Sequence, residues 1–196
     1  MSQTAKASTA THIRPIQAAD LTALKAFLSE LSPGTLYFRF GRMSVPMLTQ
    51  EQWHELCEPH PQRCAQFVAT QITGPGRYGI VGMARLVFQS SDHDSPDSAE
   101  FSMVVADHLQ NQGLGRQLMH ALVGEANRRG LTHIYGDVLP SNTTMLSFCK
   151  GLGFVSRACP DDSRIHRMTL SIRTQKFKDV TASMAAPDRG DARLQA

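Results

Sequence analysis

The feature that most constrains the fold is a change of hydrophobic period near Arg63. Upstream, the apolar residues of segment 21–31 recur at helical spacing, whereas 64–70 and 79–88 are nearly continuous runs of β-branched and apolar residues. The turn-rich segment 73–76 separates these two runs. We therefore predict a β-hairpin at the centre of the chain, preceded by helices.

Strand-like and helix-like runs alternate beyond the hairpin. Further strands are predicted at Glu100–Ala106, His133–Val138 and Ile165–Ile172, with helices after Gly115 and over Ser141–Lys150. The first of these helices has one apolar face, made of Leu118, Leu122 and Ala126 with Ala121 beside them, and is predicted to end at Gly130. This order predicts an α/β (α+β) fold in which a mixed central sheet has helices on its faces.

The N-terminal third is predicted to hold a short strand and two helices. The strand covers 13–16, and the first helix follows Asp20, which is placed to cap it, and ends at Ser32-Pro33-Gly34. The second helix spans Leu48–Cys57, with Thr49 as its N-cap.

Composition excludes several classes of protein. The 196 residues are 41% hydrophobic and 19% charged, with a net charge of +3 and no basic run longer than Arg128-Arg129, so neither a disordered chain nor a dedicated nucleic-acid binder is indicated. No apolar stretch suits a membrane helix or a secretory signal, so we expect a cytoplasmic protein with reduced cysteines. Segments 1–11 and 176–196 lack a usable period and are predicted to be disordered tails around one domain, 12–175.

The segment Gln110–Gly115 (QNQGLG) lies between a predicted strand and a predicted helix. Unpaired backbone N–H groups and the helix dipole make such a turn an anion site, and glycine lets a pyrophosphate approach the amides. A Gly-x-Gly pair is also compatible with a simple tight turn. Leu118 stands where a Rossmann fingerprint needs Gly or Ala, and Arg116-Gln117 replaces the Lys-Ser/Thr of a P-loop.

Two motifs together carry a resemblance. Gln-x-x-Gly-x-Gly at Gln110–Gly115 opens a helix, and Asn142–Phe154 (NTTMLSFCKGLGF) follows the next strand. This pair resembles the GNAT superfamily of N-acetyltransferases over about Thr11 to Ile172. The segments Leu31–Phe40 and Ala99–Phe101 are in addition similar to the acetyltransferase domain of bacterial protein-lysine acetyltransferases.

The resemblance implies a mainly antiparallel sheet and transfer of an acetyl group from acetyl-CoA to a primary amine. Protein lysine is the favoured acceptor, with a small-molecule amine, or a non-catalytic acyl-CoA-binding sensor module, as the alternatives. No metal, nucleic acid or membrane partner is implied, and the chain is expected to be a monomer or a homodimer. The implied cofactor-binding residues are Val104, Val105, Gln110, Gln112, Gly113, Leu114, Gly115, Arg116 and Asn142.

Two of the implied cofactor residues also have simpler explanations. The side chain of Asn142 could reach a pantetheine amide, but capping of the following helix explains a polar residue there equally well. Arg116 could pair with a CoA phosphate, since a cation in the first turn of a helix opposes the dipole, or it could be exposed to solvent.

Glu100 is the predicted general base, because an acceptor ammonium must lose a proton before it attacks the thioester. A carboxylate partly desolvated at this point of the strand would have a raised pKa, although a solvated strand-edge Glu fits the same pattern. Asp107 and His108 are reserve acid/base groups, and a turn Asp often only bonds its own backbone. Phe148-Cys149 occupies the place of a Leu-Tyr pair whose Tyr protonates the leaving thiolate in many relatives, so Cys149 is a candidate acid or a small buried hydrophobe.

Two further patterns are interpreted as structural. His54, Cys57, His60 and Cys64 are competent zinc ligands, but their spacing is not that of a standard finger, and no metal site is predicted. The aromatic run Tyr37-Phe38-x-Phe40 is interpreted as core or as the wall of a substrate channel, because no basic groove accompanies it.

Overall fold

The computed structural model describes residues 10–89, 97–159, 162 and 164–172. The predicted tails fall almost entirely outside these residues, as does most of the polar loop that follows the hairpin. Within the described part of the chain, no helix is long and apolar enough to cross a membrane.

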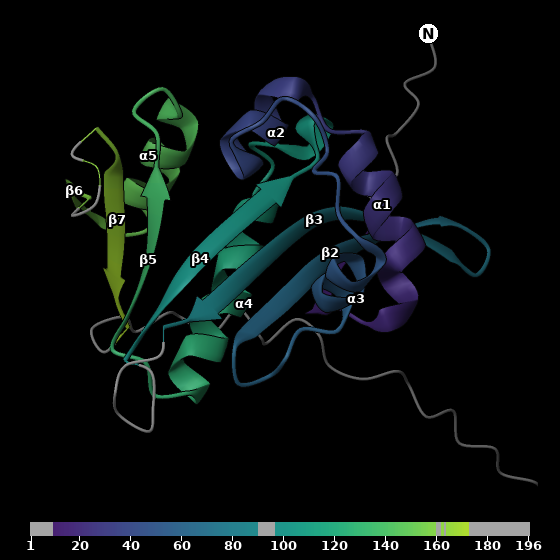
Figure 1. Ribbon diagram of the computed structural model, residues 1–196, viewed down its shortest axis with the longest axis horizontal. Helices are drawn as coiled ribbons and strands as arrows, with labels where there is room; N and C mark the ends of the chain where they lie inside the picture. The colour runs from purple at the N-terminus through teal and green to yellow at the C-terminus, as the bar shows by residue number, and fades with distance from the viewer. Residues whose placement is uncertain (1–9, 90–96, 160–161, 163, 173–196) are drawn as a thin grey trace, which may run out of the picture.

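One sheet of seven strands forms the centre of the described structure, in the order β1-β2-β3-β4-β5-β7-β6 (Figure 1). Neighbouring strands run antiparallel except β4 and β5, which are parallel. The mixed, mainly antiparallel sheet is therefore confirmed. The strands are β1 (Thr11–Pro15), β2 (Cys64–Gly74), β3 (Arg77–Phe88), β4 (Ser98–Val105), β5 (His133–Val138), β6 (Val155–Ala158) and β7 (His166–Ser171).

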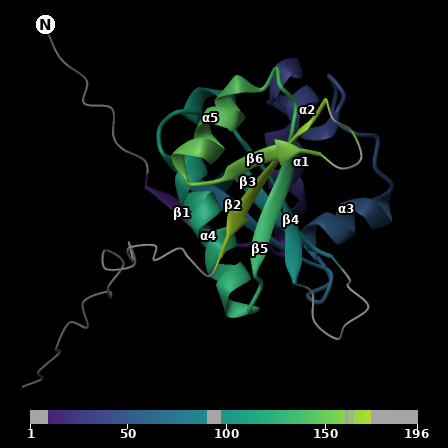
Figure 2. The same cartoon turned by 90° about the vertical axis from the view of Figure 1, so that its left-hand side faces the viewer.

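Helices cover both faces of the sheet. Figure 2, turned by 90° from Figure 1, shows α4 on one side and α1 and α3 on the other. The fifth helix, α5, lies beside the end of β5 (Figure 1). The α-helices are α1 (Leu21–Ser29), α2 (Pro33–Phe40), α3 (Gln50–Cys57), α4 (Leu114–Arg128) and α5 (Thr143–Gly151), and two short 3-10 helices are η1 (Ala18–Asp20) and η2 (Asp107–Leu109).

The apolar face predicted for α4 is confirmed. Leu118, Leu122 and Ala126 are all fully buried against the sheet. On the facing strand β3, Gly82 permits the close approach, because a Cβ built there would lie 3.0 Å from Cδ1 of Leu118 and 3.3 Å from a backbone oxygen. The burial of a leucine side chain contributes about 2 kcal/mol, so this face alone anchors α4.

The N-cap predicted from the sequence is confirmed for α3 and is wrong for α1. Thr49 and Gln52 form the predicted cap of α3: the Thr49 Oγ1 accepts from the Gln52 N–H at 3.3 Å, and Gln52 Oε1 accepts from the Thr49 N–H at 2.9 Å. Asp20 does occupy the N-cap position of α1, but its side chain makes no capping bond to that helix. Instead it is buried in an ion pair with Arg14, described in the Discussion.

Two elements were not predicted from the sequence. Ser32-Pro33-Gly34 were expected to end the first helix, but α1 already ends at Ser29 and these residues begin α2. Ser32 is the N-cap, accepting from Thr35 N–H at 3.3 Å, and Pro33 takes the first helical position, where its missing N–H costs nothing. The other element, β6, is a four-residue edge strand whose residues are all exposed.

Candidate functional site

The site is created by the divergence of β4 and β5. These parallel strands pair only from Ser98↔His133 to Glu100↔Tyr135, and beyond that point they separate into a V (Figure 1). From Phe101 onward, β4 is paired with β3 on one edge only. Its other edge, which faces the V, has no pairing with β5 in the described register. Such an open strand edge can hydrogen-bond an extended amide-bearing ligand.

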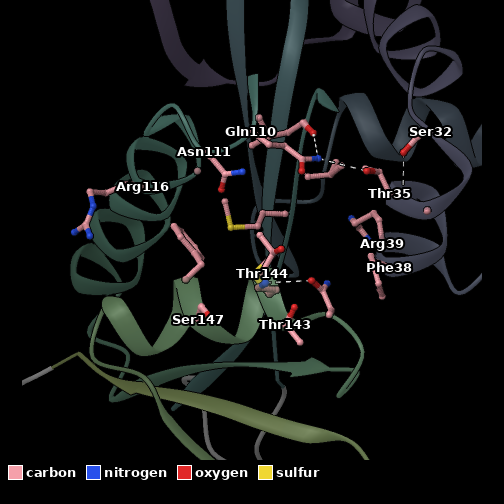
Figure 3. A pocket seen from close by; sticks show the side chains of 18 of the residues that line it. Ser32, Thr35, Phe38, Arg39, Gln110, Asn111, Arg116, Thr143, Thr144 and Ser147 are labelled. Atoms are coloured by element: carbon pink, nitrogen blue, oxygen red, sulfur yellow. Dashed lines mark hydrogen bonds between the residues drawn. The ribbon is translucent and has the colours of Figure 1, made fainter. Parts of the chain in front are cut away.

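A cavity of about 880 Å³ opens in this V. In Figure 3, α2 contributes Ser32, Thr35, Phe38 and Arg39 on one side, α5 contributes Thr143, Thr144 and Ser147, and Arg116 lies at the far end. Most of the predicted cofactor residues line the cavity, namely Val104, Val105, Gln110, Gly113, Gly115, Arg116 and Asn142. The structure thus brings together residues that are well separated in sequence.

Two of the predicted cofactor residues, Gln112 and Leu114, do not line the cavity. Leu114 packs into the hydrophobic core, and the exposed Gln112 donates through Nε2 to the carbonyl of His108 at 2.8 Å. Contact of these two residues with a cofactor would therefore have to come from their backbone N–H groups.

The glycine loop has the conformation that an anion site needs. Gly113, with φ +85°, and Asn111, with φ +59°, both lie in the left-handed region, and α4 begins directly afterwards at Leu114. An L side chain at Gly113 would be strained, whereas a Cβ at Gly115 would meet Met103 and Phe148 at an ordinary 3.6 Å. The start of this 15-residue helix lines the cavity through Gly113, Gly115 and Arg116, and the N-terminus of a helix suits a phosphate group.

A polar network ties the loop to α2. The carboxylate of Asp107 accepts from the Ser32 N–H at 2.9 Å, from Ser32 Oγ at 2.7 Å and from Thr35 Oγ1 at 2.7 Å. Gln110 Nε2 donates to the Val105 carbonyl at 3.2 Å and to Thr35 Oγ1 at 3.4 Å. Burial by itself would raise the pKa of Asp107, but these hydrogen bonds lower it below its usual value. These hydrogen bonds suit a positioning group, and a role of Asp107 as a reserve acid or base stays a prediction.

Asn142 caps α5 and also lines the larger cavity, so its contact with a cofactor stays a prediction. Its Oδ1 accepts from the Met145 N–H at 3.1 Å and caps α5, while the side chain lines the cavity. The capping bond uses the oxygen, so the amide N–H groups remain to face a ligand.

A second cavity of about 160 Å³ adjoins the first and contains Glu100. It lies between α2, β4 and the end of β5, and shares Phe38, Arg39 and Asn142 with the larger cavity. Glu100 is exposed, so the partial desolvation expected from the sequence is not found. Its location is nevertheless the one that a base requires, where the last β4–β5 pair gives way to the open V.

The candidate acid Cys149 is wrongly placed for that role. It is fully buried in the hydrophobic core and lines neither cavity, and burial raises the pKa of its thiol to about 12. The preceding residue, Phe148, lines the larger cavity instead. Because a helix turns by about 100° per residue, adjacent residues of α5 face in different directions.

The structure also shows where the His/Cys pattern and the aromatic run lie. His54 and His60 are exposed while Cys57 and Cys64 are buried, and among the described residues no three His, Cys, Asp or Glu side chains gather as metal ligands. In the aromatic run, Phe38 lines both cavities, in agreement with a channel wall.

Sequence reasoning missed the contribution of α2. Ser32, Thr35 and Arg39 face the site because this helix crosses the open end of the V. The Ser-Pro pair is typical of an N-cap followed by the first helical residue and would have indicated the helix.

The comparisons with known proteins agree with this geometry. The profile of the Acetyltransferase (GNAT) family matches residues 32–154, which span α2 to the end of α5 and the loop beyond. This chain belongs to the GNAT acetyltransferase family. It is 32% identical to acetyltransferase PA5475 of Pseudomonas aeruginosa over 163 residues, which cover 81% of this chain and 83% of that protein.

Solved GNAT structures share the fold. The GNAT domain of S. lividans PAT superposes with a TM-score of 0.72 at 22% identity, over 82% of this chain and 90% of that one. Spermidine N-acetyltransferase from Vibrio cholerae, in complex with CoA and spermine, gives a TM-score of 0.63 at 18% identity, over 83% and 96%. The V between β4 and β5 therefore lies in a fold for which a CoA complex is known.

Proposed function

We propose that this GNAT acetyltransferase uses acetyl-CoA as donor and transfers the acetyl group to the ε-amine of a protein lysine, with Glu100 as the general base. The observation that carries the proposal is the connection between the two cavities. The larger one is lined by the start of α4 and the glycine loop before it, and the smaller one, which contains Glu100, shares Phe38, Arg39 and Asn142 with it.

The larger cavity fits the donor in shape and chemistry. Its volume of about 880 Å³ is within the range of cofactor sites. The N-terminus of α4 and Arg116 would hold the phosphates, while Asn142 and the open edge of β4 would hold the pantetheine amides. Acetyl-CoA supplies the activated acetyl thioester.

In the reaction, Glu100 removes a proton from the acceptor ammonium, whose reference pKa is about 10.4. The neutral amine attacks the acetyl carbonyl, the new C–N bond forms as the C–S bond breaks, and the nitrogen loses a second proton as it becomes the amide. One of the two protons reaches the CoA sulfur through Glu100 or water, and the other is released to solvent. Since Cys149 is buried away from both cavities, no thiol acid is included in this scheme.

Exposed apolar side chains favour a polypeptide acceptor over a small amine. On α2 and the segment after it, Tyr37 is 41% exposed, Phe38 44%, Met43 67% and Met47 96%. Phe38 also lines both cavities, so this surface begins at the site itself. Aromatic and methionine side chains of this kind are enriched where proteins bind other proteins.

The test is Glu100→Gln, which keeps the size of the side chain and removes the base. We expect CoA release with a lysine peptide to fall about 10²-fold or more while acetyl-CoA affinity stays unchanged, and the acidic limb of the pH–rate profile to disappear. Glu55→Gln, at an exposed position on α3, is the matched control and should keep wild-type rates.

Three outcomes would contradict parts of the proposal. A change below about threefold across pH 6–9 would exclude Glu100 as the base. Turnover with small amines but not with lysine peptides would favour the small-molecule alternative. Tight acetyl-CoA binding without CoA release for any amine would favour a non-catalytic binding module.

A further inference from the structure

The smaller cavity is lined by an arginine, Arg39, that forms no ion pair within 4.0 Å in the described part of the chain. Arg39 projects from α2 into both cavities, and its Nε is buried with no hydrogen-bond partner among the described residues. Its only described close contact is with the ring of Phe40, whose centroid lies 4.7 Å from the guanidinium carbon. An arginine has five N–H donors, and leaving them desolvated and unpaired is costly.

A second arginine increases the positive charge of this region. On β3, Arg85 pairs in register with Ser102 of β4, two residues along the strands from the pair formed by Val87 and Glu100. Its Nε is also buried without a partner among the described residues, and its Nη2 donates to the sulfur of Cys64 at 3.3 Å, which is a weak acceptor. Burial and, less strongly, the charge of Arg85 lower the pKa of Arg39 to about 10, although the charge of Glu100 acts in the opposite direction.

The carboxylates that line the smaller cavity do not balance these cations. Asp137 accepts two hydrogen bonds from Arg167, each of 2.8 Å, so its charge is already paired. Glu100 forms no ion pair within 4.0 Å in the described structure, and it shares the lining of the cavity with Arg39, whose charge is also felt by Arg85 on the neighbouring strand. Once Glu100 has taken a proton from the acceptor, the cavity carries no unpaired negative charge.

We propose that Arg39 binds a carboxylate of the acceptor molecule, so that the preferred substrate is a lysine with an acidic residue beside it. This inference rests on the proposed function and deepens it by naming the chemical class of the acceptor. A cavity of about 160 Å³ holds roughly five water-sized groups, enough for the end of a lysine side chain and one carboxylate. A polycationic amine would bring further positive charge toward Arg39 and Arg85 and is disfavoured.

The phosphates of CoA are not the natural partner of Arg39. Arg116, in the first turn of α4, lies at the opposite end of the larger cavity from Arg39 in Figure 3. The part of the donor nearest to Glu100 is the uncharged acetyl end, because the phosphates occupy the α4 end of the site. An anion beside Arg39 therefore has to come with the acceptor.

Three peptides of equal length test the proposal, each with one lysine flanked by Glu, Gln or Lys. For the wild-type enzyme we expect kcat/KM to be about tenfold or more higher with the Glu peptide than with the Gln peptide, which is the effect of one charge-assisted hydrogen bond. The Lys-flanked peptide and spermidine should be the poorest acceptors. Free lysine, which carries its own carboxylate, distinguishes an α-carboxylate from an acidic side chain as the bound group.

Variants assign the preference to Arg39. Arg39→Gln should remove the advantage of the Glu peptide through KM and leave acetyl-CoA affinity within twofold, and Arg39→Lys should restore part of the advantage. Arg42→Gln, at an exposed position after α2, is the matched control and should keep the wild-type preference. Calorimetric binding of the Glu and Gln peptides to the CoA-loaded protein measures the same preference without turnover.

Several results would overturn the inference. Equal kcat losses for all peptides in Arg39→Gln would show that Arg39 acts on the transferred acetyl group, and weakened acetyl-CoA binding would place it in the donor site. Equal use of the Glu and Gln peptides by the wild-type enzyme would overturn it without any variant. If no amine released CoA, the proposed function would fail, while the binding preference would still decide the role of Arg39.

Discussion

Two carboxylates, Asp20 and Asp107, lie at helix N-termini in opposite parts of the molecule. Asp20 precedes α1 and is fully buried, and it accepts two hydrogen bonds of 2.7 Å from Arg14, one of 2.6 Å from Tyr78 Oη and one of 2.9 Å from Gln17 N–H. Asp107 is exposed and accepts three hydrogen bonds from Ser32 and Thr35 at the start of α2. Only the second cluster contributes lining residues to a cavity.

We infer from this difference that a hydrogen-bonded carboxylate contributes mainly to stability at Asp20 and mainly to the geometry of the site at Asp107. Removal of a buried ion-pair partner leaves an uncompensated charge in a low-dielectric environment, whereas removal of an exposed one leaves groups that water can solvate. The partners then decide the functional consequence, since Ser32 and Thr35 line the larger cavity, whereas Arg14 and Tyr78 line neither of the two cavities.

The largest expected effect is that of Asp20→Ala on stability. We expect a loss of about 3–5 kcal/mol in the free energy of unfolding, because the guanidinium of Arg14 stays partly buried without its partner. Denaturant unfolding measures this loss, and the folded fraction should bind acetyl-CoA like the wild type. Asp162→Ala, in a surface pair with the 87% exposed side chain of Arg164, is the control and should leave the midpoint unchanged. A loss below about 1 kcal/mol for Asp20→Ala would break the comparison.

Asp107→Ala should have a smaller effect on stability and a larger one on activity. We expect a loss of about 1 kcal/mol, as for other helix-terminal carboxylates and caps. The KM values for acetyl-CoA and for the acceptor should rise severalfold, because α2 and the loop lose their connection, while kcat changes less. A fall of about 10²-fold in kcat at unchanged KM would instead identify Asp107 as the acid/base group.

The smallest expected effect is the change with acid pH in what Asp20 and Asp107 each contribute to the free energy of unfolding. Burial tends to raise the pKa of Asp20, but hydrogen bonds from Arg14, Tyr78 and Gln17 lower it below the ordinary value of 3.8. The pKa of Asp107 is lowered in the same direction. A lowered folded-state pKa means that the stabilisation is present above the unfolded-state pKa and is lost as pH falls through the folded-state value.

Unfolding curves between about pH 2 and pH 6 check this expectation. The stability difference between the wild type and Asp20→Asn should be constant above about pH 5 and shrink below the ordinary pKa of 3.8. The corresponding difference for Asp107→Asn should be smaller over the same range. A difference that grew on acidification would reverse the sign of the linkage and refute the assignment.

Much of the fold could be predicted from local signals. The hairpin of β2 and β3, the apolar face of α4 and the cap of α3 each depend on residues close in sequence, and all three are confirmed. The Gly-x-Gly turn likewise carries its own evidence, because a φ of +85° at Gly113 favours glycine. Two predictions from the sequence were wrong: Asp20 does not cap α1 through its side chain, and α2 was not predicted. At both places the side chains bond partners that are distant in sequence.

The sequence by itself determined the class of fold, the family and the Gly-x-Gly turn before α4, since periodicity, turn chemistry and spacing are local properties of the chain. The tertiary structure alone decided which side chains share a cavity. Cys149 and Phe148 are neighbours in sequence, yet helical geometry buries the first and turns the second toward the site. Asp107 and Ser32 are 75 residues apart, and Arg39 meets Glu100 only because β4 and β5 diverge beneath α2. Contacts of this kind depend on chain topology, which short-range patterns do not encode.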